Sequence, residues 1–271
     1  MAKVSKRISD RFVKSVAKFQ KVLQIAKDRD VNESDTVSIL TDVFSEVFGY
    51  DKYLEITREF AIRSTYCDLA LKIDEKVQYL IEVKAIGIQL NESHMKQAVD
   101  YGANHGIEWI ILTNGVEWRV YKIRFEKPIN YDLVCSFDFL ELKARTEKDQ
   151  ELLFIVAKEG LSKNTRKEYH EKTQTINRFM IGGLILNDVI LNAVRRELRK
   201  LANGVRIDVP EIENIVRNEV LKREIVEGDD AKIAQSRISR FYKKANKKSL
   251  KKKTEKACSV AKEACSETEQ A

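Results

Sequence analysis

The sequence contains few residues that break regular structure and no long apolar run. Only 2 Pro and 10 Gly occur among 271 residues, which excludes a collagen-like chain. No uninterrupted apolar stretch approaches the roughly 18 residues of a membrane-spanning helix. The first 25 residues alternate charged and apolar side chains, so a secretory leader is not expected. Hydrophobic residues make up 43% of the chain, which is enough for a core and excludes a wholly disordered protein.

Cysteine is also sparse. Cys67, Cys135, Cys258 and Cys265 are widely spaced and form no C-x-x-C pair, and the three histidines do not cluster with them. This spacing argues against a disulfide scaffold and against a structural zinc site. Unpaired thiols fit a reducing compartment, so we expect a cytoplasmic protein.

Charge is abundant and unevenly distributed. The net charge of +7 arises from 49 basic and 42 acidic residues. Residues 1–30 contain nine Lys or Arg and three Asp, and residues 237–256 contain ten Lys or Arg and one Glu. Basic ends favour a polyanionic partner, either nucleic acid or a membrane surface. A solvated tail that aids solubility explains the C-terminal end equally well, so both interpretations stay open.

Hydrophobic periodicity predicts an α/β region followed by a helical region. Helices are expected over 8–27, 34–48 and 92–104, and strands over 53–62, 66–73, 77–84, 107–113, 116–123 and 131–140. Further helices are expected over 147–158, 166–180, 183–202, 209–222 and 229–245. We therefore expect an α/β domain over 1–145, a helical domain over 146–245 and a disordered Lys-rich tail over 246–271.

The first predicted helix is amphipathic. Its apolar stripe consists of Ile8, Phe12, Val16, Phe19 and Leu23, which recur every three or four residues. Such a stripe faces a protein core in most cases, although a basic amphipathic helix also binds anionic membranes. A core-facing stripe is the favoured interpretation.

The strands over 66–73 and 77–84 predict an antiparallel hairpin that turns at Asp74-Glu75-Lys76. In this register Asp68 lies opposite Glu82. Because side chains alternate along a strand, one face is almost entirely apolar and belongs in the core. That face carries Cys67, Leu69, Leu71, Ile73, Val77, Tyr79, Ile81 and Val83.

The other face of this hairpin brings Asp68, Glu82 and Lys84 together at the end remote from the turn. Two carboxylates about 4 Å apart repel by roughly 4 kcal/mol at an effective dielectric near 20. A hard divalent cation offsets this repulsion, because carboxylate oxygens are the ligands that Mg²⁺ accepts. A metal-bound water beside an ammonium group is suited to phosphodiester hydrolysis. The alternative is a surface salt bridge of about 0–1 kcal/mol.

Two further polar groups follow on the helix over 92–104. Gln97 and Tyr101 are four residues apart and share one face of that helix, where an amide and a phenol could hold a phosphate or order a water. The segment Thr113-Asn114-Gly115 then marks a tight turn between two strands, with Trp118 shortly after it.

Residues 53–123 resemble the PD-(D/E)xK nuclease superfamily. Within it they are most similar to the N-terminal nuclease domain of the restriction (R) subunit of type I restriction-modification enzymes. The resemblance implies a restriction-endonuclease-like mixed sheet flanked by helices. It makes Asp68 the first acid of the superfamily motif, with Glu82 and Lys84 as its E-x-K, although Cys67 stands where Pro is common.

The type I branch is indicated by the residues downstream. Gln97 and Tyr101 match its Q-x-x-x-Y motif, and Thr113-Asn114-Gly115 with Trp118 matches its hairpin. A further acid of the superfamily often comes from the first core helix, and Glu46 is the candidate here.

The resemblance implies a Mg²⁺-dependent DNA endonuclease in which Mn²⁺ can substitute. Asp68, Glu82 and the carbonyl of Val83 would hold the metal, and Lys84 would position the attacking water. Expected partners are DNA and other restriction-modification subunits or a second copy of the chain. The sequence lacks the G-x-x-x-x-G-K-[ST] phosphate loop, so no ATP-dependent translocase is expected.

Two alternatives stay open. The first is a DNA-binding or adaptor protein that retains the nuclease fold without turnover. The second is a membrane-surface protein anchored by residues 8–27.

Overall fold

The computed structural model describes residues 4–62, 65–126, 128–202 and 204–244. The chain divides into two compact units between Lys172 and Thr173. The Lys-rich tail that we predict to be disordered, 246–271, lies outside the described residues. No helix in the described ranges is long and apolar enough to cross a membrane.

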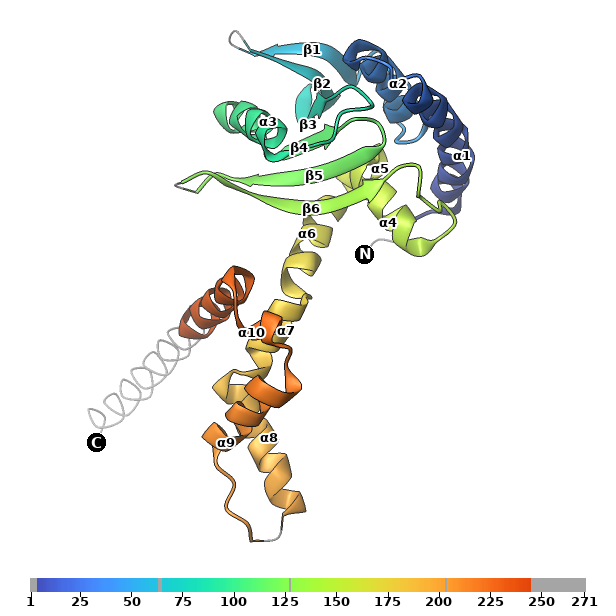
Figure 1. The fold of residues 1–271 in the computed structure, drawn as a ribbon. Coiled ribbons are helices and arrows are strands. Elements are labelled where there is room, and N and C mark those ends of the chain that lie inside the picture. Colours follow the sequence, from blue (N-terminus) through green and yellow to red (C-terminus); the bar gives the residue numbers. More distant parts are fainter. Residues whose placement is uncertain (1–3, 63–64, 127, 203, 245–271) are drawn as a thin grey trace, which may run out of the picture. The chain divides into compact units, whose positions relative to one another are not determined.

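The first unit is built on a six-stranded mixed sheet (Figure 1). Its strands follow the order of the chain: β1 (Ile56–Ile62), β2 (Thr65–Ile73), β3 (Lys76–Val83), β4 (Trp109–Thr113), β5 (Glu117–Arg124) and β6 (Asn130–Asp138). The neighbours β3 and β4 are parallel, and the other adjacent pairs are antiparallel. This is the α/β, restriction-endonuclease-like sheet flanked by helices that the sequence predicts.

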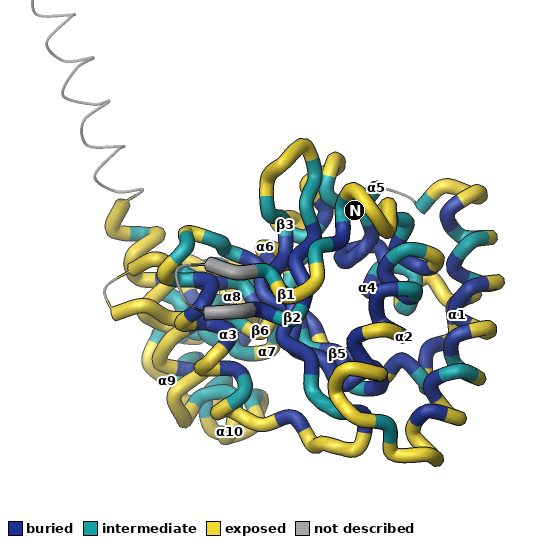
Figure 2. Tube along the Cα trace, turned by 90° about the horizontal axis from the view of Figure 1, so that it is seen from above, coloured by how far each residue is buried: buried dark blue, intermediate teal, exposed yellow. Residues whose placement is uncertain are grey.

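Helices cover both faces of this sheet. One face packs against α1 (Lys6–Asp28), α2 (Glu33–Glu46), α4 (Glu147–Val156) and α5 (Lys158–Ser162), and the other packs against α3 (Glu92–His105). All five residues of the predicted apolar stripe of α1 are buried. Figure 2 shows the buried side of α1 turned toward α2 and α4. The stripe therefore belongs to the core, and the membrane-anchor interpretation of this helix is wrong.

The β2–β3 hairpin keeps the predicted register in its middle and departs from it near the turn. Leu69 pairs with Ile81 and Leu71 with Tyr79, as expected. The turn contains two residues, Asp74 and Glu75, both with positive φ (49° and 62°), and β3 already begins at Lys76. Two left-handed residues give the turn whose twist matches that of the strands. The predicted three-residue turn is therefore wrong, and a register shift absorbs the difference.

The extra residue of that register shift, Gln78, is held from outside the sheet. Arg166 of α6 (Thr165–Thr175) donates to the carbonyl oxygen of Gln78 at 2.8 Å and to its side-chain Oε1 at 2.9 Å. Its guanidinium lies 4.9 Å and 4.8 Å from the ring centroids of Tyr79 and Trp109. These contacts attach α6 to the sheet.

The first unit extends beyond the predicted domain boundary at 145. The side chains of 152–157 are buried in the core of the sheet. Tyr50 and Tyr79 donate from their hydroxyls to the carbonyl oxygens of Val156 and Ile155, each at 2.8 Å. Because α4 completes this core, the observed division lies after Lys172.

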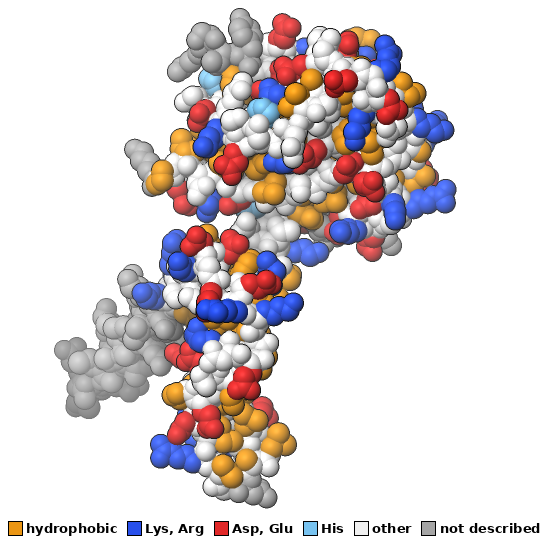
Figure 3. Space-filling view, in the orientation of Figure 1, with side chains coloured by type: hydrophobic (Ala, Val, Ile, Leu, Met, Phe, Trp, Pro, Cys, Tyr) orange, Lys and Arg blue, Asp and Glu red, His pale blue; other side chains and the backbone are white. Residues whose placement is uncertain are grey.

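The second unit is helical. It contains α7 (Arg178–Ile185), α8 (Asp188–Leu201), α9 (Val209–Ile215), a π-helical turn (Val216–Val220), α10 (Arg223–Val226) and a helix over 229–244. The two helices predicted over 166–180 and 183–202 are three, because the side chains of Asn177 and Asn187 cap the starts of α7 and α8. Hydrophobic side chains, including Leu201 and Val220, are exposed in this unit, and Figure 3 shows several on its surface.

Candidate active site

The carboxylate of Asp68 is tied to the neighbouring strand. Its Oδ2 accepts a hydrogen bond from the main-chain N–H of Val83 at 2.7 Å. The strand pairing is in register at Leu69 and Ile81, the residues next to Asp68 and Glu82, so Asp68 lies beside the last residues of β3. The predicted proximity of Asp68 to the E-x-K segment is thus present in the structure.

Glu82 and Lys84 form a short ion pair at the same strand end. The Nζ of Lys84 lies 2.6 Å from Oε1 of Glu82. Glu82 is 4% exposed, whereas Lys84 and Asp68 are half-buried and retain contact with solvent. The main chain of Lys84 is fixed by a 2.9 Å hydrogen bond from its N–H to the carbonyl oxygen of Thr113 on β4. The parallel partner strand therefore sets where the lysine leaves the sheet.

A third acid comes from the first turn of α2. Oε2 of Glu33 lies 3.7 Å from Nζ of Lys84. Glu46, the helix acid expected from the sequence, is the last of the 14 residues of α2. At about 1.5 Å per residue, it is roughly 20 Å further along the helix. Its carboxylate instead pairs with Lys18 of α1, at 2.6 Å. The structure therefore does not bring Glu46 to the strand ends, where Glu33 is the acid that α2 contributes.

Burial makes this group of acids electrostatically unfavourable. Desolvation raises the pKa of Asp68, although the Val83 N–H and the charge of Lys84 partly oppose the shift. Desolvation also raises the pKa of Glu82; Lys84 opposes this shift, and the charges of Asp68 and Glu33 add to it. Burial alone would lower the pKa of Lys84, but its hydrogen bond to Glu82 and the nearby carboxylates raise it above its ordinary value. One ammonium thus faces three carboxylates.

Cys67 lies on the opposite side of the sheet from the one predicted. It is buried in the apolar cluster under α3, together with Ala70 and Leu80, whereas Leu69 and Leu71 face α1 and α2. Strict alternation therefore fails on β2 between Cys67 and Leu69, and on β1 the residue facing this point, Glu59, has φ 47°. Burial raises the pKa of the Cys67 thiol to about 12, which agrees with the expectation that it is not a reactive group.

Gln97 and Tyr101 lie on α3, as the sequence predicts. Tyr101 is buried in the apolar cluster between α3 and the sheet, and Gln97 is exposed one turn before it. The ring of Tyr101 packs against His105, with 5.7 Å between the ring centroids. A role of Gln97 and Tyr101 at the scissile phosphate stays a prediction.

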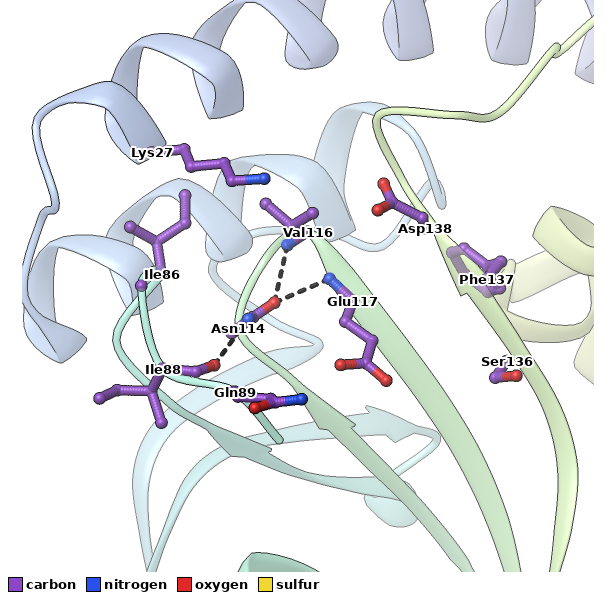
Figure 4. Close-up of a pocket in the computed structure, with 11 residues that line it drawn as sticks. Lys27, Ile86, Ile88, Gln89, Asn114, Val116, Glu117, Ser136, Phe137 and Asp138 are labelled. Atoms are coloured by element: carbon purple, nitrogen blue, oxygen red, sulfur yellow. Dashed lines mark hydrogen bonds between the residues drawn. The ribbon is translucent and has the colours of Figure 1, made fainter. Parts of the chain in front are cut away.

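The segment Thr113-Asn114-Gly115 braces the loop that follows Lys84. Oδ1 of Asn114 accepts from the main-chain N–H groups of Val116 and Glu117 at 3.1 and 2.7 Å, and its Nδ2 donates to the carbonyl oxygen of Ile88 at 2.9 Å (Figure 4). Gly115 has φ 89°, a conformation that glycine adopts without strain. The predicted hairpin thus has a supporting function next to the site.

A cavity of about 490 Å³ lies beside this loop, and Figure 4 draws the residues that line it. Its charged lining consists of Lys27, Glu117 and Asp138, and none of the clustered acids lies in it. Because Asp68, Glu82 and Lys84 all lie outside its lining, this cavity is not the candidate site.

A smaller cleft of about 160 Å³ contains Asp68. It is lined by Glu33, Ser34, Val37, Arg58, Glu59 and Asp68, and we call it the Asp68 cleft. Within the described ranges, no three His, Cys, Asp or Glu side chains are arranged as a ready metal cluster. The oxygen atoms of Asp68, Glu82 and the Val83 carbonyl nevertheless suit Mg²⁺, which uses one or two carboxylates and keeps several waters.

Residues 40–133 match the family model of the type I restriction enzyme R protein N terminus (HSDR_N). The resemblance of residues 53–123 to the N-terminal domain of the R subunit is thereby confirmed. The matched R-protein segment includes Asp68, Glu82 and Lys84, while Glu33 precedes it. No curated protein and no solved structure matches the chain.

Proposed function

We propose that the chain is a Mg²⁺-dependent DNA endonuclease that works without an ATP-driven translocase. The match to the R-protein N terminus supports a role in restriction-modification. Mn²⁺ is expected to replace Mg²⁺. The partners we propose are DNA and either other restriction-modification subunits or a second copy of the chain, in the cytoplasm.

The residues divide the work as follows. Asp68, Glu82 and the carbonyl oxygen of Val83 would hold the metal, and Glu33 would contribute through a water or directly. When bound, Mg²⁺ would supply a coordinated water of lowered pKa and would polarise the phosphoryl oxygen. Lys84 orients that water and stabilises the negative charge that develops on the phosphorus oxygens. Gln97 and Tyr101 orient the scissile phosphate.

A single observation carries this proposal: the buried carboxylate of Glu82, the half-buried one of Asp68 and the exposed one of Glu33 lie around one ammonium, that of Lys84. Burying an unbalanced negative charge destabilises a fold. A site that binds a divalent cation explains why such an arrangement is present. An ordinary salt bridge would need one acid and would lie at the surface.

The test is cleavage by the purified full chain. Linear, supercoiled and single-stranded DNA are incubated with Mg²⁺, Mn²⁺ or EDTA, without ATP. We expect cleavage that EDTA abolishes, and its loss in Asp68→Ala and Lys84→Ala. Lys18→Ala is a matched control, because Lys18 also pairs with a glutamate at 2.6 Å but lies outside the site.

The outcomes separate the two functional interpretations. DNA binding by the wild type without any EDTA-sensitive cutting would favour the adaptor alternative. Full activity of Asp68→Ala and Lys84→Ala would eliminate the proposed mechanism. Circular dichroism of each variant establishes that the fold is intact.

A further inference from the structure

The Asp68 cleft contains one arginine. Arg58 lies on β1, the strand at one edge of the sheet, and lines the cleft together with Glu33, Glu59 and Asp68. Its main chain pairs with Leu69, the residue after Asp68. The guanidinium is therefore placed by the strand directly beside the one that carries the first acid.

Arg58 makes no ion pair with any residue that the structure describes, although three acids share its cleft. Among the described residues, its guanidinium donates one hydrogen bond, a long contact of 3.4 Å from Nη2 to Oγ of Ser38 on α2. By contrast, Arg11 and Arg119 each lie 2.6 Å from a carboxylate. The five N–H donors of the Arg58 guanidinium thus remain largely available to a ligand.

The neighbouring backbone is strained at this point. Glu59 has φ 47°, and the pairs on either side of it place it opposite Asp68. A non-glycine residue in the left-handed region costs about 1–3 kcal/mol, and such residues gather at functional sites. The irregularity reshapes the edge strand where Arg58 lines the cleft.

Lys84 alone does not offset the carboxylates around the cleft. The ammonium of Lys84 is already engaged by Glu82 at 2.6 Å and lies 3.7 Å from Glu33. A phosphodiester approaching three carboxylates is repelled until positive charge offsets them. A guanidinium is suited to this role, because its planar fork binds two phosphate oxygens at once.

We propose that Arg58 binds the non-bridging oxygens of the scissile phosphate in the Asp68 cleft. This inference rests on the proposed nuclease function. It assigns to Arg58 a direct contact with the reacting group, and it assigns to the cleft a DNA phosphate as its ligand.

The experiment compares Arg58→Ala and Arg58→Lys with Arg145→Ala, a control at an exposed arginine outside the cleft. Cleavage of a short duplex is followed with Mg²⁺, and binding is followed by fluorescence anisotropy with EDTA. We expect Arg58→Ala to lower kcat about 100-fold, the effect of removing one charge-stabilising donor. Arg58→Lys restores part of the activity, and the melting temperatures of all three variants stay close to that of the wild type.

A modified substrate distinguishes a direct phosphate contact from a structural role of Arg58, because a structural role would not change how the protein discriminates between charged and uncharged linkages. A methylphosphonate at the scissile position removes the charge that Arg58 contacts. The wild type should bind this duplex about tenfold more weakly than the phosphate, and Arg58→Ala should bind both equally. Equal discrimination by wild type and Arg58→Ala would overturn the inference.

The outcomes distinguish this inference from the proposed function. Wild-type cleavage with unchanged rates and discrimination in Arg58→Ala rejects the role of Arg58 and leaves the nuclease standing. Absence of cleavage by the wild type, with binding lost in Arg58→Ala and kept in Arg145→Ala, rejects the nuclease and supports the phosphate contact. Absence of cleavage with unchanged binding rejects both.

Discussion

Replacing Asp68 by Asn should stabilise the metal-free protein while abolishing cleavage. The amide oxygen of Asn can still accept the hydrogen bond from the Val83 N–H, which is 2.7 Å long in the wild type. The substitution removes the desolvation of one carboxylate and the repulsion from Glu33, and it loses the attraction to Lys84. Since desolvation is the largest contribution, we expect a gain of about 1 kcal/mol, or roughly 2–4 °C in Tm.

The gain should depend on pH in a defined direction. The pKa of Asp68 is raised in the folded state. The folded state therefore holds the Asp68 proton more tightly than the unfolded state does. The resulting stabilisation is complete below the unfolded-state pKa of about 3.9, and it is lost as pH rises through the higher folded-state pKa. Asp68→Asn removes this loss of stability at high pH. The variant should therefore be more stable than the wild type at pH 7.5 in EDTA and about equally stable near pH 3.5.

Urea unfolding at both pH values measures these differences, with Glu46→Gln as the control. Glu46 is a half-exposed surface acid paired with Lys18, so its neutralisation should change the free energy of unfolding by less than about 0.5 kcal/mol. Mg²⁺ at 100 times its Kd should stabilise the wild type by about 2.7 kcal/mol and leave Asp68→Asn nearly unchanged. A variant less stable than wild type at pH 7.5 in EDTA would refute the reasoning.

Three further predictions concern the support of the site. Asn114→Ala removes three hydrogen bonds of a buried side chain and should cost about 2–3 kcal/mol in urea unfolding, whereas Asn130→Ala at an exposed strand end should cost under about 0.5. Arg166→Ala removes two hydrogen bonds and two ring contacts and should lower the free energy of unfolding by about 2–3 kcal/mol. The control Lys167→Ala, at an exposed position, should cause no measurable loss. Equal losses of stability in the two variants would contradict the role of Arg166 as an anchor. Cys67, with its pKa raised to about 12 by burial, should resist maleimide at pH 8 in the folded protein and react in urea, as peptide mass spectrometry can record.

Alternation along strands was enough to predict the sheet and the E-x-K group. The β2–β3 face that carries Leu69, Leu71 and Ile81 is buried as expected, and Asp68 reaches the segment that contains Glu82 and Lys84. These features depend on the two-residue alternation of side chains along a strand, which can be read from the sequence.

Departures from the predictions arise where the backbone leaves its regular geometry. Three residues have left-handed backbone conformations: Asp74 and Glu75 in the β2–β3 turn, and Glu59 in the β1–β2 ladder. Glycine adopts this conformation readily and would have indicated it in the sequence, whereas Asp and Glu do not. Glu33 was not predicted as a site residue, because acidic residues are common in the first turn of helices, where they interact favourably with the helix dipole. The apolar run of α4 fits any core, so its membership in the first unit needed tertiary contacts.

The irregular Glu59 also bears on how the protein avoids self-association. β1 ends one side of the sheet, and an outer strand of this kind offers unpaired N–H and C=O groups to a strand from another molecule. A left-handed residue flanked by the charged Arg58 interrupts the straight row of groups that such an addition needs. The same local distortion that shapes the cleft therefore discourages fibril-like stacking along this border.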